Sequence, residues 1–440
     1  MGMSALAEIL AAKGFEVTGS DRYLDQGQDL DVLRVLRAQG VRLFPQDGSA
    51  IAPGLAGVVV STAIEPGNPD LAAAARAGVR VWQRAERLAE LVGDAPCVAV
   101  AGTSGKTTVT GMAGWVFERL GLDPTVVNGG AVLNWAQPGR LGAVRAGGGR
   151  WWVVETDESD RSFLRFRPEW AIVTNLSADH FGLGETVALF RDFATRCRSG
   201  IVTPDAAAAA ALGGPSARPP VYGPESAPAI EPAVWGSRFE FAGVRVEVPL
   251  RGRHNAENAL GVMMLAQRMG LDLARAAAAL REFRGIQRRL ECVGMAGGVT
   301  VIDEYAHNPA KIAAAWAAVA ETAPRVLGVW RPHGFRPLAA MFDDLAAALS
   351  SAMRREDRLW LLPVYYAGGT APRGRTSAEL AEEISRRGGR AEAVADYDAL
   401  EAALLPEIRR GDVALVMGAR DPGLPQFARS LAAKLKRGKG

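Results

Sequence analysis

Residues 97–120 constrain the fold of this chain more than any other segment. A continuous apolar run, Cys97–Ala101, leads directly into Gly-Thr-Ser-Gly-Lys-Thr-Thr at 102–108, and a helical pattern then extends from Val109 to Leu120. Glycines between a buried strand and a helix allow backbone N–H groups to turn inward, and the helix N-terminus adds partial positive charge at the same place. The segment therefore predicts a strand–loop–helix unit that binds phosphate oxygens.

Two side chains of this loop suit a bound nucleotide. Lys106 can reach the β- and γ-phosphates of ATP, and the hydroxyl of Thr107 can ligate Mg²⁺. The alternative is a Gly-rich turn with an exposed lysine, which we disfavour because the strand, loop and helix signals all agree. We expect ATP to contact the whole loop, that is Gly102, Thr103, Ser104, Gly105, Lys106, Thr107 and Thr108.

The rest of the chain predicts an α/β protein of several domains. Its 440 residues are too many for one hydrophobic core, and strand and helix signals alternate throughout, which favours parallel sheets. Glycine and proline at 93–96 indicate a linker just before the phosphate loop. A third group of strand signals begins near Gly294, with apolar runs that include 326–330 and 413–417.

Composition and charge exclude several other classes of protein. The net charge of +3 is small for 440 residues, so we expect neither a nucleic-acid nor a membrane partner. Cys97, Cys197 and Cys292 lie far apart, which argues against a zinc site or disulfides and fits a reducing, cytoplasmic compartment. Neither a long apolar run nor a signal-peptide pattern is seen, and the absence of a full GxGxxG disfavours a Rossmann oxidoreductase.

Two polar segments follow buried-strand candidates downstream of the loop. Glu155 comes directly after an apolar run and opens an acidic stretch that ends at Asp160. His180 closes the segment Thr-Asn-Leu-Ser-Ala-Asp-His after the next run. Because α/β proteins bind ligands at the carboxyl ends of parallel strands, a carboxylate there can hold Mg²⁺ beside the phosphate loop. The alternative for Asp160, a solvated acidic turn, is the one we favour.

These motifs resemble those of the Mur ligase family, and they occur in the family's order. The resemblance rests on Gly-Thr-x-Gly-Lys-Thr-Thr at 102–108, Glu-Thr-Asp-Glu-Ser-Asp at 155–160 and Thr-Asn-x-x-x-Asp-His at 174–180. It continues with Gly-x-His-Asn-x-x-Asn at 252–258, Gly-x-x-Arg-Arg-x-Glu at 285–291 and an Asp-Glu-Tyr-Ala-His-Asn-Pro segment at 303–309. It covers nearly the whole chain and is strongest for the branch that adds L-alanine to UDP-N-acetylmuramate.

The resemblance implies three α/β domains and a two-step reaction. Residues 1–93 would form a Rossmann-like domain for the UDP-sugar, 94–293 the central ATP-binding domain, and 294–440 a Rossmann-like domain that brings in the amine. ATP would phosphorylate the carboxylate of the UDP-sugar, and the amine would then displace phosphate, as in peptidoglycan precursor synthesis. This activity would make the chain an ATP-dependent ligase with ATP and Mg²⁺ as cofactors.

The resemblance also implies roles for individual residues. Lys106 and His180 would be catalytic, and Thr107, Glu155 and His180 would bind the metal ions. Further contacts to ATP would come from His254, Asn255, Asn258, Arg288 and Asp303, although helix capping by the asparagines and a salt-bridged Arg288 are alternatives. The substrates would be bound by Gly2, Met3, Ser4, Ser20, Asp21, Ser61, Asn128, His307, His333 and Arg336.

Three departures from the family pattern affect the substrate sites. The chain begins at the last part of the family's first Gly-rich loop, so we expect the given sequence to lack the first strand of the first domain. Ser177 stands where the alanine-adding branch usually has Glu, and Gly334 stands where the family has an arginine that grips the amino acid. A ligase that adds another amino acid or a murein peptide, and an inactive nucleotide-binding relative, therefore remain alternatives.

Overall fold

The computed structural model describes residues 2–28, 30–61, 64–177, 181–213, 217–225, 229–233, 235–366 and 374–437. The chain divides into two compact units, which are described separately. Unit 1 comprises Met1–Glu231, Ser237–Pro249 and His254–Ile286, and unit 2 comprises Pro232–Gly236, Leu250–Arg253 and Gln287–Gly440. The predicted division at 293/294 lies inside strand β15 (Glu291–Ala296), whereas the units divide at 286/287. The predicted bounds of the three domains stay a prediction.

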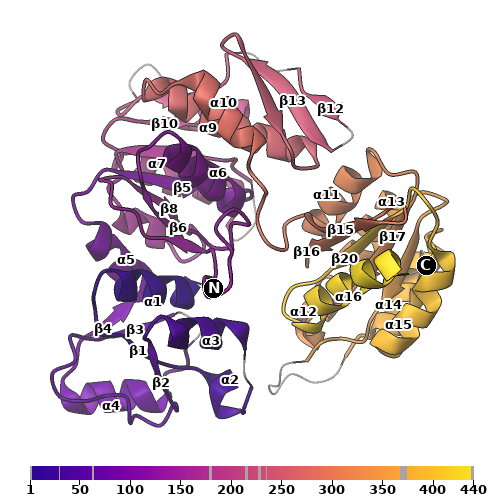
Figure 1. The fold of residues 1–440 in the computed structure, drawn as a ribbon, viewed down its shortest axis with the longest axis horizontal. Helices are drawn as coiled ribbons and strands as arrows, with labels where there is room; N and C mark the ends of the chain where they lie inside the picture. The colour runs from indigo at the N-terminus through magenta and orange to yellow at the C-terminus, as the bar shows by residue number, and fades with distance from the viewer. Residues whose placement is uncertain are drawn as a thin grey trace. The chain divides into compact units, whose positions relative to one another are not determined.

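The first part of unit 1 has two small parallel sheets (Figure 1). Strand β1 pairs with β2 and strand β3 pairs with β4, and no ladder joins the two sheets within the described residues. The first strand starts at Thr18. The elements are α1 (Gly2–Ala12), β1 (Thr18–Ser20), α2 (Arg22–Asp25), α3 (Asp31–Ala38), β2 (Arg42–Phe44), β3 (Val58–Val60), α4 (Pro69–Ala77), β4 (Val81–Gln83) and α5 (Arg84–Val92).

A seven-stranded sheet forms the centre of unit 1, in the order β11-β10-β9-β5-β8-β6-β7. All neighbours are parallel except β6 and β7. Helices cover buried parallel strands on both faces, which explains why β5 reads as a continuous apolar run. The strands are β5 (Cys97–Ala101), β6 (Thr125–Val127), β7 (Val144–Arg145), β8 (Trp152–Glu155), β9 (Trp170–Val173), β10 (Gly200–Val202) and β11 (Val221–Tyr222).

Apolar packing joins the first part of unit 1 to this sheet. Ala5, Leu6 and Ile9 of α1 share one core with Leu88 of α5 and with residues of β5, β8 and β9. The remaining helices of unit 1 are α6 (Lys106–Arg119), η1 (Ser162–Arg165), α7 (Leu183–Ala194), α8 (Ala206–Leu212), α9 (Arg253–Arg268) and α10 (Leu273–Arg281). A small sheet of β12 (Glu231–Ala233), β13 (Gly236–Phe241) and β14 (Val244–Val248) precedes α9, and β13 and β14 are antiparallel.

Unit 2 is a six-stranded sheet with helices on both faces (Figure 1). The order is β15-β16-β20-β17-β18-β19, and only the β15/β16 pair is antiparallel. One buried core includes residues of α11, α13 and α14, and the other includes residues of α15 and α16. The elements are β15 (Glu291–Ala296), β16 (Val299–Glu304), α11 (Pro309–Ala320), β17 (Val326–Trp330), α12 (Phe335–Ala340), α13 (Phe342–Ala352), β18 (Arg358–Leu361), α14 (Ser377–Arg386), β19 (Ala391–Ala393), α15 (Tyr397–Leu404), η2 (Leu405–Glu407), β20 (Val413–Met417) and α16 (Gly423–Arg437).

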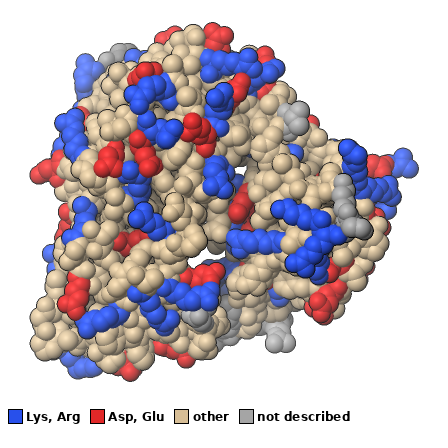
Figure 2. Space-filling model, in the orientation of Figure 1, with Lys and Arg blue, Asp and Glu red and all other residues tan. Residues whose placement is uncertain are grey.

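The surface carries charges of both signs. Lys and Arg are interspersed with Asp and Glu on the face shown in Figure 2, as the small net charge of +3 suggests. None of the helices among the described residues is long and apolar enough to span a membrane.

Candidate active site

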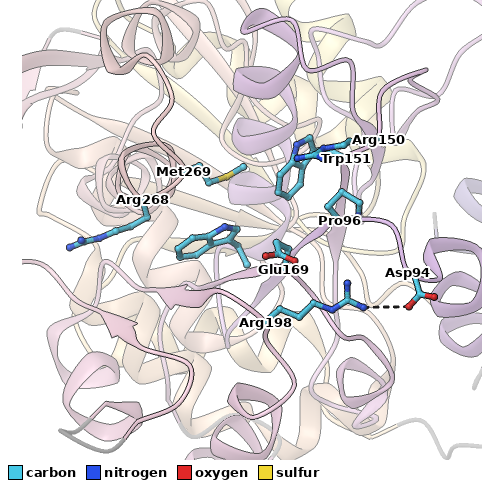
Figure 3. Close-up of a pocket in the computed structure, with 9 residues that line it drawn as sticks. Asp94, Pro96, Arg150, Trp151, Glu169, Arg198, Arg268 and Met269 are labelled. Carbon is cyan, nitrogen blue, oxygen red and sulfur yellow. Dashed lines mark hydrogen bonds and ion pairs between the residues drawn. The ribbon is translucent and has the colours of Figure 1, made fainter.

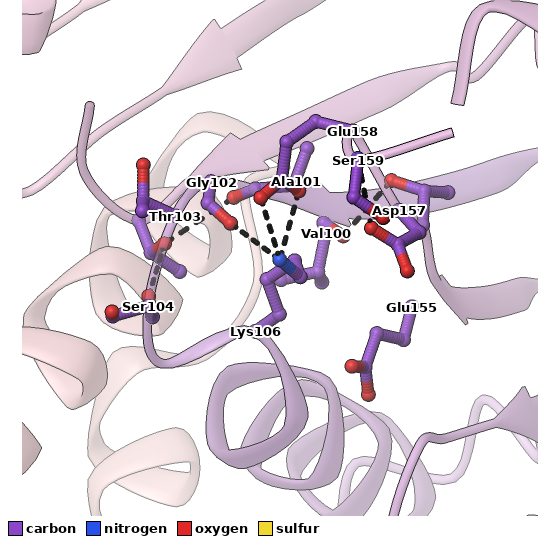
Figure 4. Close-up of polar contacts among 12 residues, drawn as sticks. Val100, Ala101, Gly102, Thr103, Ser104, Lys106, Glu155, Asp157, Glu158 and Ser159 are labelled. Carbon is purple, nitrogen blue, oxygen red and sulfur yellow. Dashed lines mark hydrogen bonds and ion pairs between the residues drawn. The ribbon is translucent and has the colours of Figure 1, made fainter. Parts of the chain in front are cut away.

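The phosphate loop occupies the carboxyl end of β5, between that strand and α6. The Lys106 ammonium donates to the Gly102 carbonyl at 2.8 Å and to both carboxylate oxygens of Glu158 at 2.8 and 3.0 Å (Figure 4). The Lys106 and Glu158 side chains are 15% and 6% exposed, so this ion pair is largely shielded from water. The Lys106 side chain is therefore held against its own loop by the Glu158 carboxylate, which comes from the turn after β8.

Two glycines of the loop are required by its geometry. Gly102 has φ +126°, and a Cβ there would lie 2.2 Å from Thr174 Oγ1. Gly105 has φ +86° and caps α6, and a Cβ there would lie 2.6 Å from Asn258 Oδ1. Side-chain-bearing residues rarely adopt such φ values. The same contacts show that the loop packs against the segment after β9 and against the first turns of α9.

The segment after β9 fixes the outer side of the loop. Thr174 Oγ1 donates to the Ser104 carbonyl at 2.6 Å, and the Asn175 side chain both donates to that carbonyl and accepts from the Ser104 N–H, each at 3.1 Å. The Ser177 N–H donates to Thr103 Oγ1 at 3.0 Å. From this segment the sequence predicted a functional role for His180 only. It did not predict that the segment shapes the phosphate loop. Asp179 and His180 lie outside the described residues.

Glu155 lies where the sequence predicted a metal ligand. Thr107 Oγ1 donates to its Oε1 at 3.0 Å, and the Gly129 N–H donates to its Oε2 at 2.7 Å. Two oxygen atoms that could ligate a metal ion, from Thr107 and Glu155, thus lie side by side next to the phosphate loop. Mg²⁺ prefers oxygen ligands of this kind. No group of three or more His, Cys, Asp or Glu side chains suited to a metal ion is found in the part of the chain that the structure describes.

The acids in the turn after β8, Asp157, Glu158 and Asp160, have different environments. Burial alone would raise the pKa of Asp157, but hydrogen bonds from Ser159 and the charges of Lys106 and Arg84 lower it overall. Asp160 is exposed and accepts a hydrogen bond from the Ser162 N–H at 2.9 Å, as expected for a solvated turn. Glu158, which the sequence did not single out, is the acid that contacts Lys106.

Three residues predicted to contact ATP, His254, Asn255 and Asn258, lie in the first turns of α9. His254 is exposed, whereas Asn255 and Asn258 are buried, and the Asn258 amide donates to Asn255 Oδ1 at 3.2 Å. Through the contact with Gly105, Asn258 touches the phosphate loop itself. The structure therefore brings this motif to the loop, as its predicted role requires.

Arg288 and Asp303 lie together in unit 2. Arg288 Nε donates to Asp303 Oδ1 at 3.3 Å, and the rest of the guanidinium donates to the Gly418 and Ala419 carbonyls. The Asp303 side chain is fully buried, and burial raises its pKa although Arg288 acts in the opposite direction. This ion pair is the structural alternative that the sequence left open for Arg288. Neither side chain can contact ATP unless the pair opens.

The comparisons with known proteins cover all three parts of the chain. The family descriptions "Mur ligase family, catalytic domain", "Mur ligase middle domain" and "Mur ligase, glutamate ligase domain" match residues 1–95, 100–189 and 288–420. A UDP-N-acetylmuramate–L-alanine ligase of Synechococcus sp. (strain JA-2-3B'a(2-13)) is 37% identical over 96% of this chain and 88% of that protein. This chain belongs to the Mur ligase family.

A second relative and two solved structures agree with that assignment. The UDP-N-acetylmuramate–L-alanine ligase of Agrobacterium fabrum is 33% identical to this Mur ligase over 99% of the chain and 95% of that protein. The crystal structure of the Thermotoga maritima UDP-N-acetylmuramate–alanine ligase has a TM-score of 0.80 at 24% identity, covering 100% of this chain and 97% of that one. A murein peptide ligase of Psychrobacter arcticus has a TM-score of 0.65 at 23% identity, with 99% and 96% covered. These two structures show the three-domain α/β fold that the sequence predicted.

The predicted sugar-binding residues of this Mur ligase have varied surroundings. Gly2, Met3 and Ser4 form the first turn of α1, and Ser61 follows β3. Ser20 donates to Asp70 at 2.6 Å and Asp21 caps α2, so both also stabilise local structure. The buried Asn128 amide nitrogen has no hydrogen-bond partner among the described residues and is thus suited to a ligand oxygen.

The predicted amine-side residues lie in unit 2 of this Mur ligase. The rings of His307 and His333 meet edge to face, with centroids 5.4 Å apart. Arg336 is exposed in α12, two residues after Gly334, the glycine that replaces the family's arginine. The structure therefore brings the two histidines together.

A cavity of about 530 Å³ lies at the end of the central sheet that is opposite to the phosphate loop (Figure 3). Its lining includes Pro96, Trp151 and Glu169, each of which precedes one of the strands β5, β8 and β9. The phosphate loop follows β5 at the other end. None of the residues that the sequence predicted for this Mur ligase's active site lines the cavity.

Proposed function

We propose that this chain joins L-alanine to the carboxylate of UDP-N-acetylmuramate at the expense of ATP, in peptidoglycan precursor synthesis. The observation that carries the proposal is the similarity to UDP-N-acetylmuramate–L-alanine ligases, which are 32–37% identical over 95–99% of this chain. The phosphate loop with Lys106 supports it, because such a loop suits phosphoryl transfer from ATP.

The proposed reaction has two steps. A carboxylate oxygen of the sugar substrate attacks the γ-phosphorus of ATP, which forms an acyl phosphate and releases ADP. The amine of L-alanine then attacks the acyl carbon, the bond from that carbon to the phosphate oxygen breaks, and inorganic phosphate and a proton leave. Lys106 would bind the transferring phosphoryl group, for which its ammonium must exchange part of its contact with Glu158 for phosphate oxygens.

Mg²⁺ belongs to this proposal as the second cofactor. Thr107 and Glu155 would hold it, since their oxygen donors lie 3.0 Å apart beside the loop, and His180 is proposed as a further ligand from the sequence. When bound, the ion would neutralise charge on the phosphates. Lys106 and the backbone N–H groups of the loop would orient the same phosphates from the other side.

A cytoplasmic location completes the proposal. ATP is consumed there, and the three cysteines are free thiols, which suits a reducing compartment. The partners are then a UDP-sugar, an amino acid and ATP, with neither a nucleic acid nor a membrane in the reaction.

A panel of amines tests the substrate assignment. With ATP, Mg²⁺ and UDP-N-acetylmuramate, phosphate release should be fastest with L-alanine and should need the sugar. Glycine, L-serine, D-alanine and an L-alanyl peptide that carries diaminopimelate provide the comparison. Faster turnover with the peptide would favour a murein peptide ligase, and no phosphate release with any amine would indicate an inactive relative.

A further inference from the structure

Three adjacent strands of the sheet in unit 2 end in register. Glu304 of β16 and Trp330 of β17 both pair with Met417 of β20, which lies between them. The chain positions three residues beyond these are His307, His333 and Arg420. Since the carboxyl ends of neighbouring parallel strands meet at one edge, these side chains belong to one cluster.

The electrostatics of the histidines agree with this placement. Burial, together with the neighbouring His307 and Arg420, lowers the pKa of His333 to about 4. Burial also lowers the pKa of His307, as do the charges of Lys311, Arg289 and Arg420, although a hydrogen bond with the Tyr305 carbonyl opposes them. Both imidazoles are therefore neutral at pH 7, and the positive charge of Arg420 acts on both of them.

Two other arginines near this edge, Arg331 and Arg288, are bound to acids. Arg331 donates to Asp421 at 2.5 Å and to the Pro363 carbonyl at 2.9 Å, and Arg288 is bound to Asp303. Arg420 is exposed and has no hydrogen-bond or ion-pair partner among the described residues. Its guanidinium is thus available for an anion.

The backbone on both sides of Arg420 is held in place. Arg288 donates to the carbonyls of Gly418 and Ala419, the two residues before it. Asp421, the residue after it, is 5% exposed and binds both Arg331 and Tyr397. The backbone that carries Arg420 is thus fixed, so binding of a ligand has to order only the side chain.

Gly334 cannot simply be replaced by the arginine of the family pattern. Its φ of +77° and ψ of 136° lie in a region that is open almost only to glycine, and its N–H donates to the Tyr365 carbonyl at 2.9 Å. The loop after β17 therefore has a different shape from one that presents an arginine at this position. A carboxylate-binding side chain therefore cannot come from position 334.

We propose that Arg420 binds the carboxylate of the incoming amino acid, with neutral His333 beside it. This proposal rests on the proposed function. It assigns the enzyme's specificity for an amino acid to Arg420, which no sequence motif singled out. A guanidinium can donate two parallel hydrogen bonds to a carboxylate, which selects an amino acid over a simple amine.

Selectivity for a carboxylate is the property to measure. Initial rates with L-alanine and with L-alaninamide, which lacks the carboxylate, give the ratio of the two kcat/KM values for the wild type, Arg420→Gln and Arg420→Lys. For Arg420→Gln we expect the KM for L-alanine to rise roughly ten- to hundredfold and the ratio to fall by a similar factor. The KM values for ATP and UDP-N-acetylmuramate should not change, and Arg420→Lys should lose less.

Two other arginine variants complete the experiment. Arg437→Gln is the matched control, since Arg437 is exposed at the far end of α16, roughly 20 Å along the helix at about 1.5 Å per residue. Arg336→Gln tests the residue that the sequence predicted for this task.

The outcomes separate the two proposals. An unchanged ratio in Arg420→Gln, or a loss of selectivity in Arg336→Gln alone, overturns the assignment of Arg420. An increased KM for ATP or the sugar instead of L-alanine also overturns it, because Arg420 would then bind a different anion. If the wild type does not use L-alanine at all, the proposed function itself fails, and the assignment of Arg420 falls with it.

Discussion

Replacing Lys106 with alanine should reduce turnover by at least about a hundredfold. The variant loses the ammonium that would stabilise the transferring phosphoryl group, and loss of one such electrostatic donor commonly raises the barrier by about 3 kcal/mol. The structure adds a second effect, because Lys106 also neutralises Glu158, whose side chain is 6% exposed. A buried carboxylate without its partner destabilises the fold by about 3–5 kcal/mol. Steady-state turnover and thermal unfolding of Lys106→Ala measure the two effects.

A double variant separates catalysis from stability at this site. In Lys106→Met with Glu158→Gln, no unpaired charge is left buried, so the unfolding temperature should return toward that of the wild type. Turnover should remain at the level of the single variant because the ammonium is still missing. A double variant that recovers both stability and turnover would show that Lys106 has a structural role alone.

Replacing Glu155 with glutamine should produce the second largest loss, through the metal requirement. Glutamine keeps the size of the side chain, and its amide can accept from the Gly129 N–H while donating to Thr107 Oγ1, so the local hydrogen bonds survive. The negative charge is lost, and Mg²⁺ affinity depends strongly on the charge of its ligands. We expect the Mg²⁺ concentration for half-maximal rate to rise by an order of magnitude or more, on the scale that a lost charge-assisted interaction implies.

Asp160→Asn is the control for that experiment. Asp160 belongs to the same acidic turn but is exposed and contacts the Ser162 N–H. Its variant should have the Mg²⁺ dependence of the wild type. If Glu155→Gln and Asp160→Asn give the same Mg²⁺ titration, Glu155 is not a metal ligand.

The sequence predicted the parallel sheets well because their strands are buried on both faces. Continuous apolar runs at β5, β9, β17 and β20 are hard to mistake, and the Gly-Lys-Thr loop marks the site between a strand and a helix. The hairpin of β13 and β14 was missed, although polar and apolar residues alternate through 237–248 and Ala242 and Gly243 turn with φ +49° and +75°. That alternation and the turn are signals that could have found it.

The pairing of charged side chains could not be predicted in the same way. The sequence does not distinguish an acidic residue at a strand end that binds a ligand from one that pairs with a neighbouring arginine. Asp303 is fully buried against Arg288, whereas Glu158 binds Lys106 of the phosphate loop, and these outcomes depend on the register of strands far apart in the chain. Arg420 was missed for a related reason, since only the alignment of β20 with β16 and β17 places it beside the two histidines.

Transfer of a carboxylate oxygen to phosphate reports directly on whether the carboxylate is phosphorylated. UDP-N-acetylmuramate labelled with ¹⁸O in its carboxylate is turned over with ATP and L-alanine, and the released phosphate is analysed by mass spectrometry. Because the acyl carbon–oxygen bond breaks when the amine attacks, an acyl phosphate requires that one labelled oxygen leaves with each phosphate. Phosphate that carries no label, released while the amide product still forms, would contradict activation of the carboxylate as an acyl phosphate.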